Sequence, residues 1–264
     1  MIRDITLGQY YQTDSPAHRL DPRIKILMTI AYIVMLFIAS NLAGLGLAAL
    51  SVLFAVAVSR VPLRFILRGV KPILFIIFLT FLLNLFMTPG ETLVQYGIFK
   101  ITREGLETAA FMAGRLVLLI FGTSLLTLTT KPIGLTDGME RLLSPFRRFG
   151  LPAHEIAMMM TIALRFIPTL LEETDKIMKA QQARGADFES GNLINRAKNL
   201  IPILVPLFIS SFRIAQDLAM AMEARCYRGG KGRTRMHEMK LGAIDFLAVL
   251  MQAAAIAVVV IWGR

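Results

Sequence analysis

The stretch ILMTIAYIVMLFIASNLAGLGLAALSVLFAVAVS, from Ile26 to Ser59, contains 34 consecutive residues without a charged side chain. One membrane-spanning helix needs about 20 apolar residues, because each helical residue rises about 1.5 Å. The stretch is too long for one span, and the polar Asn41 lies near its middle. It therefore predicts two short spans, at roughly 24–40 and 42–59, joined by a tight turn.

Three further segments have the composition of membrane spans, at 72–90, roughly 106–130 and roughly 243–263. The second of them contains Arg115, and charges inside a membrane are costly and usually functional. We expect Arg115 to anchor the bundle, to pair with Asn84 or Glu107, or to extend toward the membrane surface. The last segment ends at Trp262, where an interfacial aromatic is expected. The predicted fold class is an all-α integral membrane protein with about five transmembrane helices.

The composition of the whole chain supports this class and excludes others. The 264 residues are 55% hydrophobic, yet they carry 29 Lys and Arg against 18 Asp and Glu, for a net charge of +11. A disordered chain is excluded because it would lack this much apolar side chain. A disulfide scaffold is excluded because Cys226 is the sole cysteine. The excess of positive charge requires a partner or a membrane surface.

The distribution of charge between the spans predicts the orientation of the chain. Arg and Lys gather in the N-terminal stretch and in the connection between the second and third spans, whereas the neighbouring connections are neutral or balanced. Loops rich in Arg and Lys remain on the cytoplasmic side. We therefore expect a multi-pass protein of the cell (plasma) membrane, with its N-terminus in the cytoplasm.

A long mixed-charge block separates the fourth predicted span from the last. It holds 17 basic and 11 acidic residues, and apolar residues recur within it at spacings of three and four. This periodicity predicts two long amphipathic cytoplasmic helices, from Glu155 to Gln182 and from about Leu193 to Arg225. The chain is thus divided into an N-terminal segment with four spans (1–130), a coupling-helix region (131–242) and a last span (243–264).

Each amphipathic helix ends in a similar tripeptide, Ala183-Arg184-Gly185 in the first and Ala224-Arg225-Cys226 in the second. An arginine at a helix C-terminus interacts favourably with the helix dipole, and its guanidinium can hold a carboxylate through two hydrogen bonds. The ordinary interpretation is a pair of C-terminal caps. The duplication at the ends of paired helices favours a docking device instead.

The chain lacks the residue patterns of an enzyme or a nucleic-acid reader. Its three histidines are far apart and show no metal-ligand spacing, and no phosphate-binding GxxxxGK[ST] motif is present. His18 is expected to form hydrogen bonds within the N-terminal segment, and Ser15 to act as a turn or cap residue. The basic run 225–235 contains one aromatic residue, so attraction to an anionic leaflet explains it more simply than nucleic-acid binding.

The chain resembles the transmembrane T component of energy-coupling factor (ECF) transporters, which belong to the ABC transporters. The resemblance rests on the N-terminal motif Asp14-Ser15-Pro16-Ala17-His18-Arg19-Leu20-Asp21-Pro22-Arg23-Ile24-Lys25 and on the two arginine tripeptides, the second continued by Tyr227-Arg228-Gly229. Cys226 stands where the family often has glycine, which leaves the backbone geometry at that position open.

This resemblance implies a non-catalytic energy-coupling subunit of a vitamin or metal-ion importer. Two cytoplasmic ATP-binding-cassette subunits would each receive one arginine, Arg184 or Arg225, and would hold the ATP and magnesium, so that this chain needs no cofactor. A small substrate-binding membrane subunit (S component), or several that exchange, would pack on the apolar faces of the two helices. The expected contact residues are Met159, Ala163, Phe166, Phe208, Phe212 and Met220.

Two alternatives come from other classes. A self-contained secondary membrane carrier would need inverted repeats and broken helices at the membrane midplane, and no internal repeat is visible in the sequence. A membrane-bound enzyme would need a set of residues with catalytic spacing, which the sequence does not contain.

Overall fold

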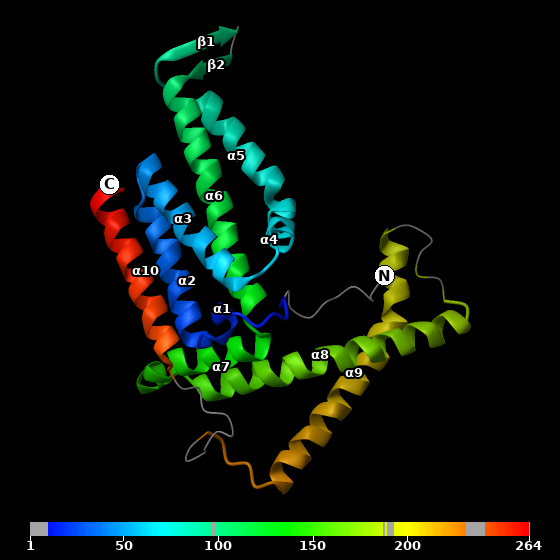
Figure 1. The fold of residues 1–264 in the computed structure, drawn as a ribbon. Helices are drawn as coiled ribbons and strands as arrows, with labels where there is room; N and C mark the ends of the chain where they lie inside the picture. The colour runs from blue at the N-terminus through cyan, green and yellow to red at the C-terminus, as the bar shows by residue number, and fades with distance from the viewer. Residues whose placement is uncertain (1–9, 97–98, 187, 189–192, 231–240, 264) are drawn as a thin grey trace. The chain divides into compact units, whose positions relative to one another are not determined.

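The computed structural model describes residues 10–96, 99–186, 188, 193–230 and 241–263. The chain divides into two compact units. The bundle unit comprises 8–142 and 237–264, and the two-helix unit comprises 143–236 together with 1–7. Figure 1 identifies the elements of each unit by label and colour.

Helices dominate the bundle unit, which also contains one hairpin. Its elements are α1 (Pro16–Arg19), α2 (Pro22–Ile38), α3 (Leu42–Ser59), α4 (Leu63–Val70), the 3₁₀ turn η1 (Lys71–Ile73), α5 (Leu74–Met87), β1 (Thr92–Tyr96), β2 (Phe99–Thr102), α6 (Arg103–Thr129), α7 (Pro132–Leu143) and α10 (Ala243–Trp262). The two-helix unit contains the 3₁₀ turn η2 (Ser144–Phe149), α8 (Ala153–Ala183) and α9 (Leu193–Ala224).

The helical membrane fold predicted from the sequence is confirmed. In the described part of the chain, 6 helices are long and apolar enough to cross a membrane: Leu42–Ser59, Leu63–Met87, Arg103–Thr129, Ala153–Ala183, Lys198–Ala224 and Ala243–Trp262. Four of these helices correspond to predicted spans. The first predicted span corresponds to α2, which has 17 residues. The two remaining helices are α8 and part of α9, whose apolar faces give them enough mean hydropathy despite their charged sides.

The core of the bundle unit lies where α2, α3, α6 and α10 meet. Its central side chains include Met35 and Leu36, which are fully buried, and Tyr32 on the same helix. The Tyr32 hydroxyl donates a hydrogen bond of 3.2 Å to the Leu118 carbonyl on α6. Gly122 lies against the Tyr32 ring, so a side chain at this position would overlap with the ring. The glycine therefore allows α2 and α6 to approach each other closely.

Two glycines bring α3 and α10 together at one end. A Cβ atom on Gly44 would lie 2.9 Å from the Cα atom of Gly263. The backbone N–H of Ser40 also donates to the Gly263 carbonyl at 2.8 Å, which ties the end of α10 to the turn between α2 and α3. The predicted tight turn around Asn41 is thus held by the C-terminal end of the last helix.

The antiparallel hairpin β1–β2 joins α5 to α6 and was not predicted from the sequence. Its base is fastened to α6 by the Glu104 carboxylate, which accepts a hydrogen bond of 2.7 Å from the Glu91 backbone N–H. Thr102 caps α6, because its hydroxyl accepts from the Gly105 N–H at 3.0 Å. Short strands have a weak periodic signal. The sequence of this segment therefore showed its balanced charge but no pattern that predicted strands.

Arg115 anchors the bundle, but not through either side chain named in the sequence analysis. Its guanidinium donates a hydrogen bond of 2.6 Å to the carbonyl of Ala39, which follows the last residue of α2. Asn84 donates instead to a backbone carbonyl on its own helix, and Glu107 pairs with Arg103 at 3.5 Å. A helix-end carbonyl without an intrahelical donor is a natural acceptor for a buried guanidinium.

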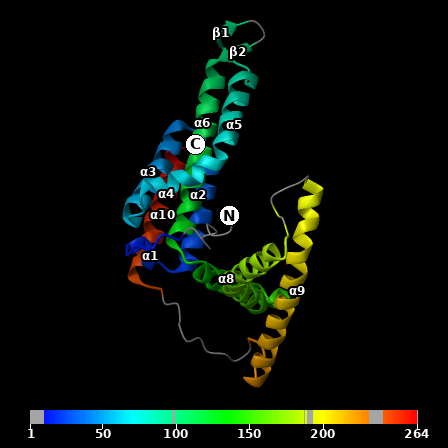
Figure 2. The same ribbon diagram turned by 90° about the vertical axis from the view of Figure 1, so that its right-hand side faces the viewer.

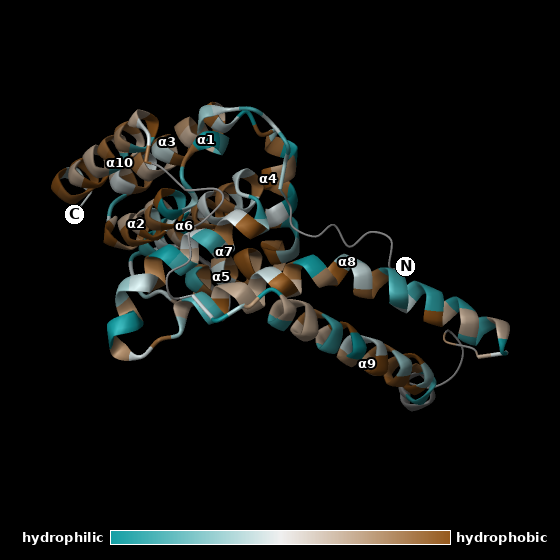
Figure 3. Cartoon of the chain, turned by 90° about the horizontal axis from the view of Figure 1, so that it is seen from below, coloured by the Kyte–Doolittle hydropathy of each residue, from teal (hydrophilic) through white to brown (hydrophobic). Residues whose placement is uncertain are grey.

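The two-helix unit has very little core of its own. Figure 1 and Figure 2 show α8 and α9 as two long rods, and they pack against each other. The buried apolar residues on these helices are Ala153, Ala157 and Ile203 in the described part of the chain. In Figure 3, apolar and polar residues alternate along both helices, whereas α10 is apolar along most of its length. Both helices therefore keep apolar surface free for other partners.

Candidate docking surfaces

The C-terminus of α8 ends in a Schellman motif. The N–H of Ala186 donates to the Gln181 carbonyl at 3.0 Å, and the N–H of Gly185 donates to the Gln182 carbonyl at 2.9 Å. Gly185 has φ +89°, a left-handed conformation that glycine adopts without a steric penalty. Gly185 therefore closes the end of α8, and Arg184 is the residue at the cap itself.

The C-terminus of α9 repeats the same motif with a different residue at the left-handed position. The N–H of Tyr227 donates to the Met222 carbonyl at 3.0 Å, and the N–H of Cys226 donates to the Glu223 carbonyl at 2.8 Å. Cys226 has φ +55°. The backbone geometry at Cys226 therefore matches the one that glycine provides in α8, at a steric cost that glycine avoids.

Both arginines are available to a partner. Arg184 and Arg225 are exposed, as are Ala183, Gly185, Ala224 and Cys226 around them. Within the residues that the structure describes, no ion pair or hydrogen bond involves either guanidinium. An unpaired guanidinium on a capped helix end can bind a carboxylate at a fixed backbone position.

The two arginines lie at opposite ends of the helix pair. A hydrogen bond of 3.3 Å joins the Tyr227 hydroxyl to Nε2 of His154, near the first residue of α8. Gly230 lies against the same imidazole, where an added Cβ would be 2.5 Å from a ring carbon. Arg225 is therefore tied to the start of α8, while Arg184 follows its end. The 31 residues of α8 correspond to about 46 Å at 1.5 Å per residue.

The residues predicted to contact a substrate-binding subunit lie outside the core of the two-helix unit. Met159, Phe208, Phe212 and Met220 are 59–67% exposed, Ala163 is exposed, and Phe166 is half-buried. Large apolar side chains rarely remain this exposed in water over a contiguous surface. The apolar faces of α8 and α9 therefore need a membrane or a protein partner.

The N-terminal motif organises the polar end of the bundle unit. Ser15 caps α1, and Nε2 of His18 donates to the Tyr11 carbonyl at 3.0 Å, so that Nδ1 accepts from the Ser15 hydroxyl at 2.7 Å. Both expected roles are confirmed. Burial lowers the pKa of His18, which favours the neutral imidazole. Asp14, by contrast, is exposed and pairs with Arg19 at 2.7 Å.

The second half of this motif connects three helices. Asp21 caps α2 and holds Arg23 at 2.6 Å, which lowers the pKa of the Asp21 carboxyl. The Asp21 N–H donates to the buried carboxylate of Asp245 on α10 at 2.8 Å. Lys25 donates to the Thr129 carbonyl at the end of α6 at 2.9 Å. Two further motif residues serve packing, since Pro22 contacts α7 and Leu20 lines a cavity described below.

The contact between His154 and Tyr227 is among those that sequence reasoning missed, and part of one prediction concerns residues outside the described ones. The His154–Tyr227 contact joins residues 73 positions apart, and no local pattern identifies such a pair. The basic run expected at an anionic leaflet lies partly outside the described residues, because Lys231, Arg233 and Arg235 fall in 231–240.

Comparison with known proteins identifies relatives that match this chain over its full length. A family model described as cobalt transport protein (CbiQ) matches residues 13–237. The chain is 58% identical over 270 residues to the energy-coupling factor transporter transmembrane protein EcfT of Clostridium kluyveri, with 100% of both chains covered. It is 56% identical to the protein of the same name from Thermosediminibacter oceani, covering 100% of this chain and 99% of the relative. The corresponding protein of Brevibacillus brevis is 48% identical over 99% of both chains.

Proposed function

Since this chain belongs to the cobalt transport protein family and is a non-catalytic transmembrane component of an energy-coupling factor transporter, we propose that its two-helix unit links two ATP-binding-cassette subunits to a substrate-binding membrane subunit. Membrane transport is thus its function, and the cargo class we propose is a vitamin or a metal ion. Recognition of the cargo would reside in the substrate-binding partner, and ATP with magnesium would be held by the ATPases.

The duplicated helix cap is the observation that carries this proposal. Arg184 and Arg225 occupy equivalent positions in two Schellman motifs with the same hydrogen bonds. Equivalent arginines are suited to two equivalent partner grooves, and the contact of Tyr227 with His154 places the second cap toward the start of α8, away from Arg184 at its end. A carboxylate in each groove would receive the guanidinium through paired hydrogen bonds.

The exposed apolar side chains of α8 and α9 support the second half of the proposal. A substrate-binding subunit that spans the membrane has an apolar surface, and Phe208, Phe212 and Met220 present one to it. Methionine is flexible and polarisable, which suits a surface that receives several different subunits in turn. Motion of the two caps, driven by the ATPases, would pass directly to this surface because both lie on the same helices.

The orientation that this mechanism requires is an N-terminus in the cytoplasm. Arg60 lies between the spans Leu42–Ser59 and Leu63–Met87, and Arg64 and Arg68 lie in the first two turns of the second span. The positive charge of this connection favours the cytoplasmic side, where the ATPases would bind.

A double charge reversal tests the proposal. We expect Arg184→Glu combined with Arg225→Glu to leave the chain in the membrane but to abolish recovery of both ATPase subunits with the tagged protein, because each groove carboxylate would then meet a like charge. The matched control is Arg165→Glu combined with Arg213→Glu, which reverses one exposed arginine within each helix. Normal recovery of both ATPases by the first variant would refute docking through the caps.

A further inference from the structure

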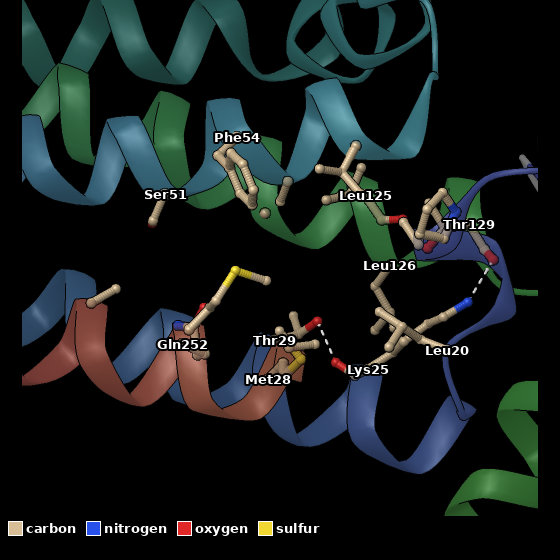
Figure 4. Close-up of a pocket in the computed structure, with 18 of the residues that line it drawn as sticks. Leu20, Lys25, Met28, Thr29, Ser51, Phe54, Leu125, Leu126, Thr129 and Gln252 are labelled. Carbon is tan, nitrogen blue, oxygen red and sulfur yellow. Dashed lines mark hydrogen bonds between the residues drawn. The ribbon is translucent and has the colours of Figure 1, made fainter. Parts of the chain in front are cut away.

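An apolar cavity of about 670 Å³ lies within the bundle unit, between α2 and α10 on one side and α3 and α6 on the other. Figure 4 shows Met28, Phe54, Leu125 and Leu126 along its walls, with Lys25 and Thr129 at one end. Residues of α1 also contribute to its lining. The volume is within the range of about 300–1,000 Å³ typical of ligand sites.

The cavity opens sideways through the gap between α3 and α10. Leu50 and Phe54 on α3 line the cavity and are 65% and 55% exposed, and Leu247 and Met251 on α10 do the same with 60% and 41% exposed. Both helices are candidate membrane spans, so these side chains would face lipid.

A polar compartment adjoins the apolar one. It has a volume of about 680 Å³ and shares Leu20, Lys25 and Thr129 with the apolar cavity. Its charged lining residues are Lys25, Lys131 and the Arg19–Asp14 ion pair, and the neutral imidazole of His18 also lines it. The Arg19–Asp14 ion pair is neutral as a whole, and the carboxylates of Asp245 and Asp21 interact with Lys25, so Lys131 is the lining cation that these acids leave uncompensated.

Two groups in the polar compartment retain hydrogen-bonding capacity. Thr130 is 4% exposed, and its hydroxyl has no hydrogen-bond partner in the described part of the chain. The Lys25 ammonium donates to the carbonyls of His18 and Thr129 at 3.1 and 2.9 Å, which uses two of its three N–H groups. A buried hydroxyl without a partner is costly, so a ligand that accepts its hydrogen bond would be stabilised.

We propose that the two compartments together bind one anionic phospholipid. An acyl chain enters the apolar cavity from the bilayer between α3 and α10, and the phosphate accepts hydrogen bonds from Thr130 and Lys25 beside Lys131. This arrangement matches the order of apolar and charged groups in a phospholipid at the membrane surface. It also agrees with the general preference of basic pockets between transmembrane helices for anionic head groups. The inference concerns the bundle unit and is independent of how the ATPases dock.

Native mass spectrometry of the purified, delipidated full-length chain tests the proposal, with phosphatidylglycerol and phosphatidylcholine of the same acyl chains as probes. We expect phosphatidylglycerol to bind at least fivefold more tightly. Lys131→Gln should weaken phosphatidylglycerol binding about fivefold, because a lysine near an anionic lipid contributes about 1 kcal/mol, and should leave phosphatidylcholine unchanged. Thr130→Val should also weaken phosphatidylglycerol binding, because it removes the hydroxyl at nearly constant volume.

Two further variants separate the apolar compartment from general charge effects. Ala55→Phe fills the apolar cavity and should weaken the binding of both lipids, and Ser51→Leu fills it from the preceding turn of α3 if the first variant does not fold. Arg64→Gln removes an exposed charge that lines neither compartment and should change nothing.

Three outcomes would overturn the proposal. Equal affinity for the two lipids would exclude an anionic head-group site, and unchanged binding in the filled variants would exclude the apolar cavity. Binding of inorganic phosphate without binding of either lipid would identify a site for a free anion instead.

Discussion

Replacement of Cys226 by glycine should strengthen the end of α9, because this residue adopts a left-handed conformation at φ +55°. A left-handed residue with a Cβ atom costs about 1–2 kcal/mol relative to glycine. The greater freedom of glycine in the unfolded chain offsets about 0.4–1 kcal/mol of this gain. The helix end should therefore be stabilised by about 1 kcal/mol, the difference between these two ranges.

Hydrogen exchange measures this change at the amides that form the cap. The N–H groups of Cys226 and Tyr227 donate to Glu223 and Met222, and both exchange only when the last turn opens. Stabilisation by about 1 kcal/mol slows their exchange about fivefold. Mass spectrometry of a peptide that covers 220–230 reports this rate for the purified protein in detergent.

The cap of α8 provides the reciprocal control. Gly185→Cys places the same side chain in the same motif and should accelerate exchange at the amides of position 185 and Ala186 by a similar factor. Recovery of the ATPases should be unaffected by Cys226→Gly, because Arg225 and the backbone geometry are retained. Exchange at the end of α9 that is unchanged or faster in Cys226→Gly would refute the equivalence of the two caps.

Three further predictions concern the bundle unit. Burial lowers the pKa of His18 below its usual 6.5. The contribution of the neutral imidazole to stability is therefore complete above pH 6.5 and is lost as the pH falls through the lowered pKa. Thermal unfolding between pH 5 and pH 8 should show this loss, and His18→Gln should remove that part of the pH dependence. Gly122→Val should destabilise the bundle by about 1–3 kcal/mol through overlap with the Tyr32 ring, and a melting temperature equal to that of the unmodified chain would contradict this contact. Arg115→Met should cost about 1.5–3 kcal/mol by removing the charged hydrogen bond to the Ala39 carbonyl, whereas an unchanged denaturation midpoint would show that Arg115 does not anchor the bundle.

Apolar length and local capping patterns were sufficient to predict most helices. The uncharged stretch from Ile26 to Ser59 predicted α2 and α3, and the break at Asn41 lies between them in the structure. The 3.6-residue periodicity likewise predicted α8 and α9, whose observed ends lie within two residues of the expected ones. Such patterns can be recognised in a sequence because each depends on neighbours only a few positions away in the chain.

Contacts between distant segments could not be predicted in the same way. The carboxylate of Asp245 is buried and accepts a hydrogen bond from the Asp21 backbone 224 positions away, and no local pattern in the sequence marks this pair. The Arg115 guanidinium donates its hydrogen bond to a backbone carbonyl rather than to an acidic or amide side chain. A carbonyl at a helix end is present in every helix, so no residue type in the sequence marks it as the partner.

If the two equivalent caps dock as proposed, they would make the chain a bivalent ligand. An ATPase of a linked pair that has bound Arg184 would bring its partner to Arg225 at a high effective concentration, so two modest contacts would give strong overall binding. This gain requires that the spacing of the two grooves match the length of the helix pair. Because a helix hardly stretches, removal of two turns from α8 would abolish the gain while leaving both arginines intact.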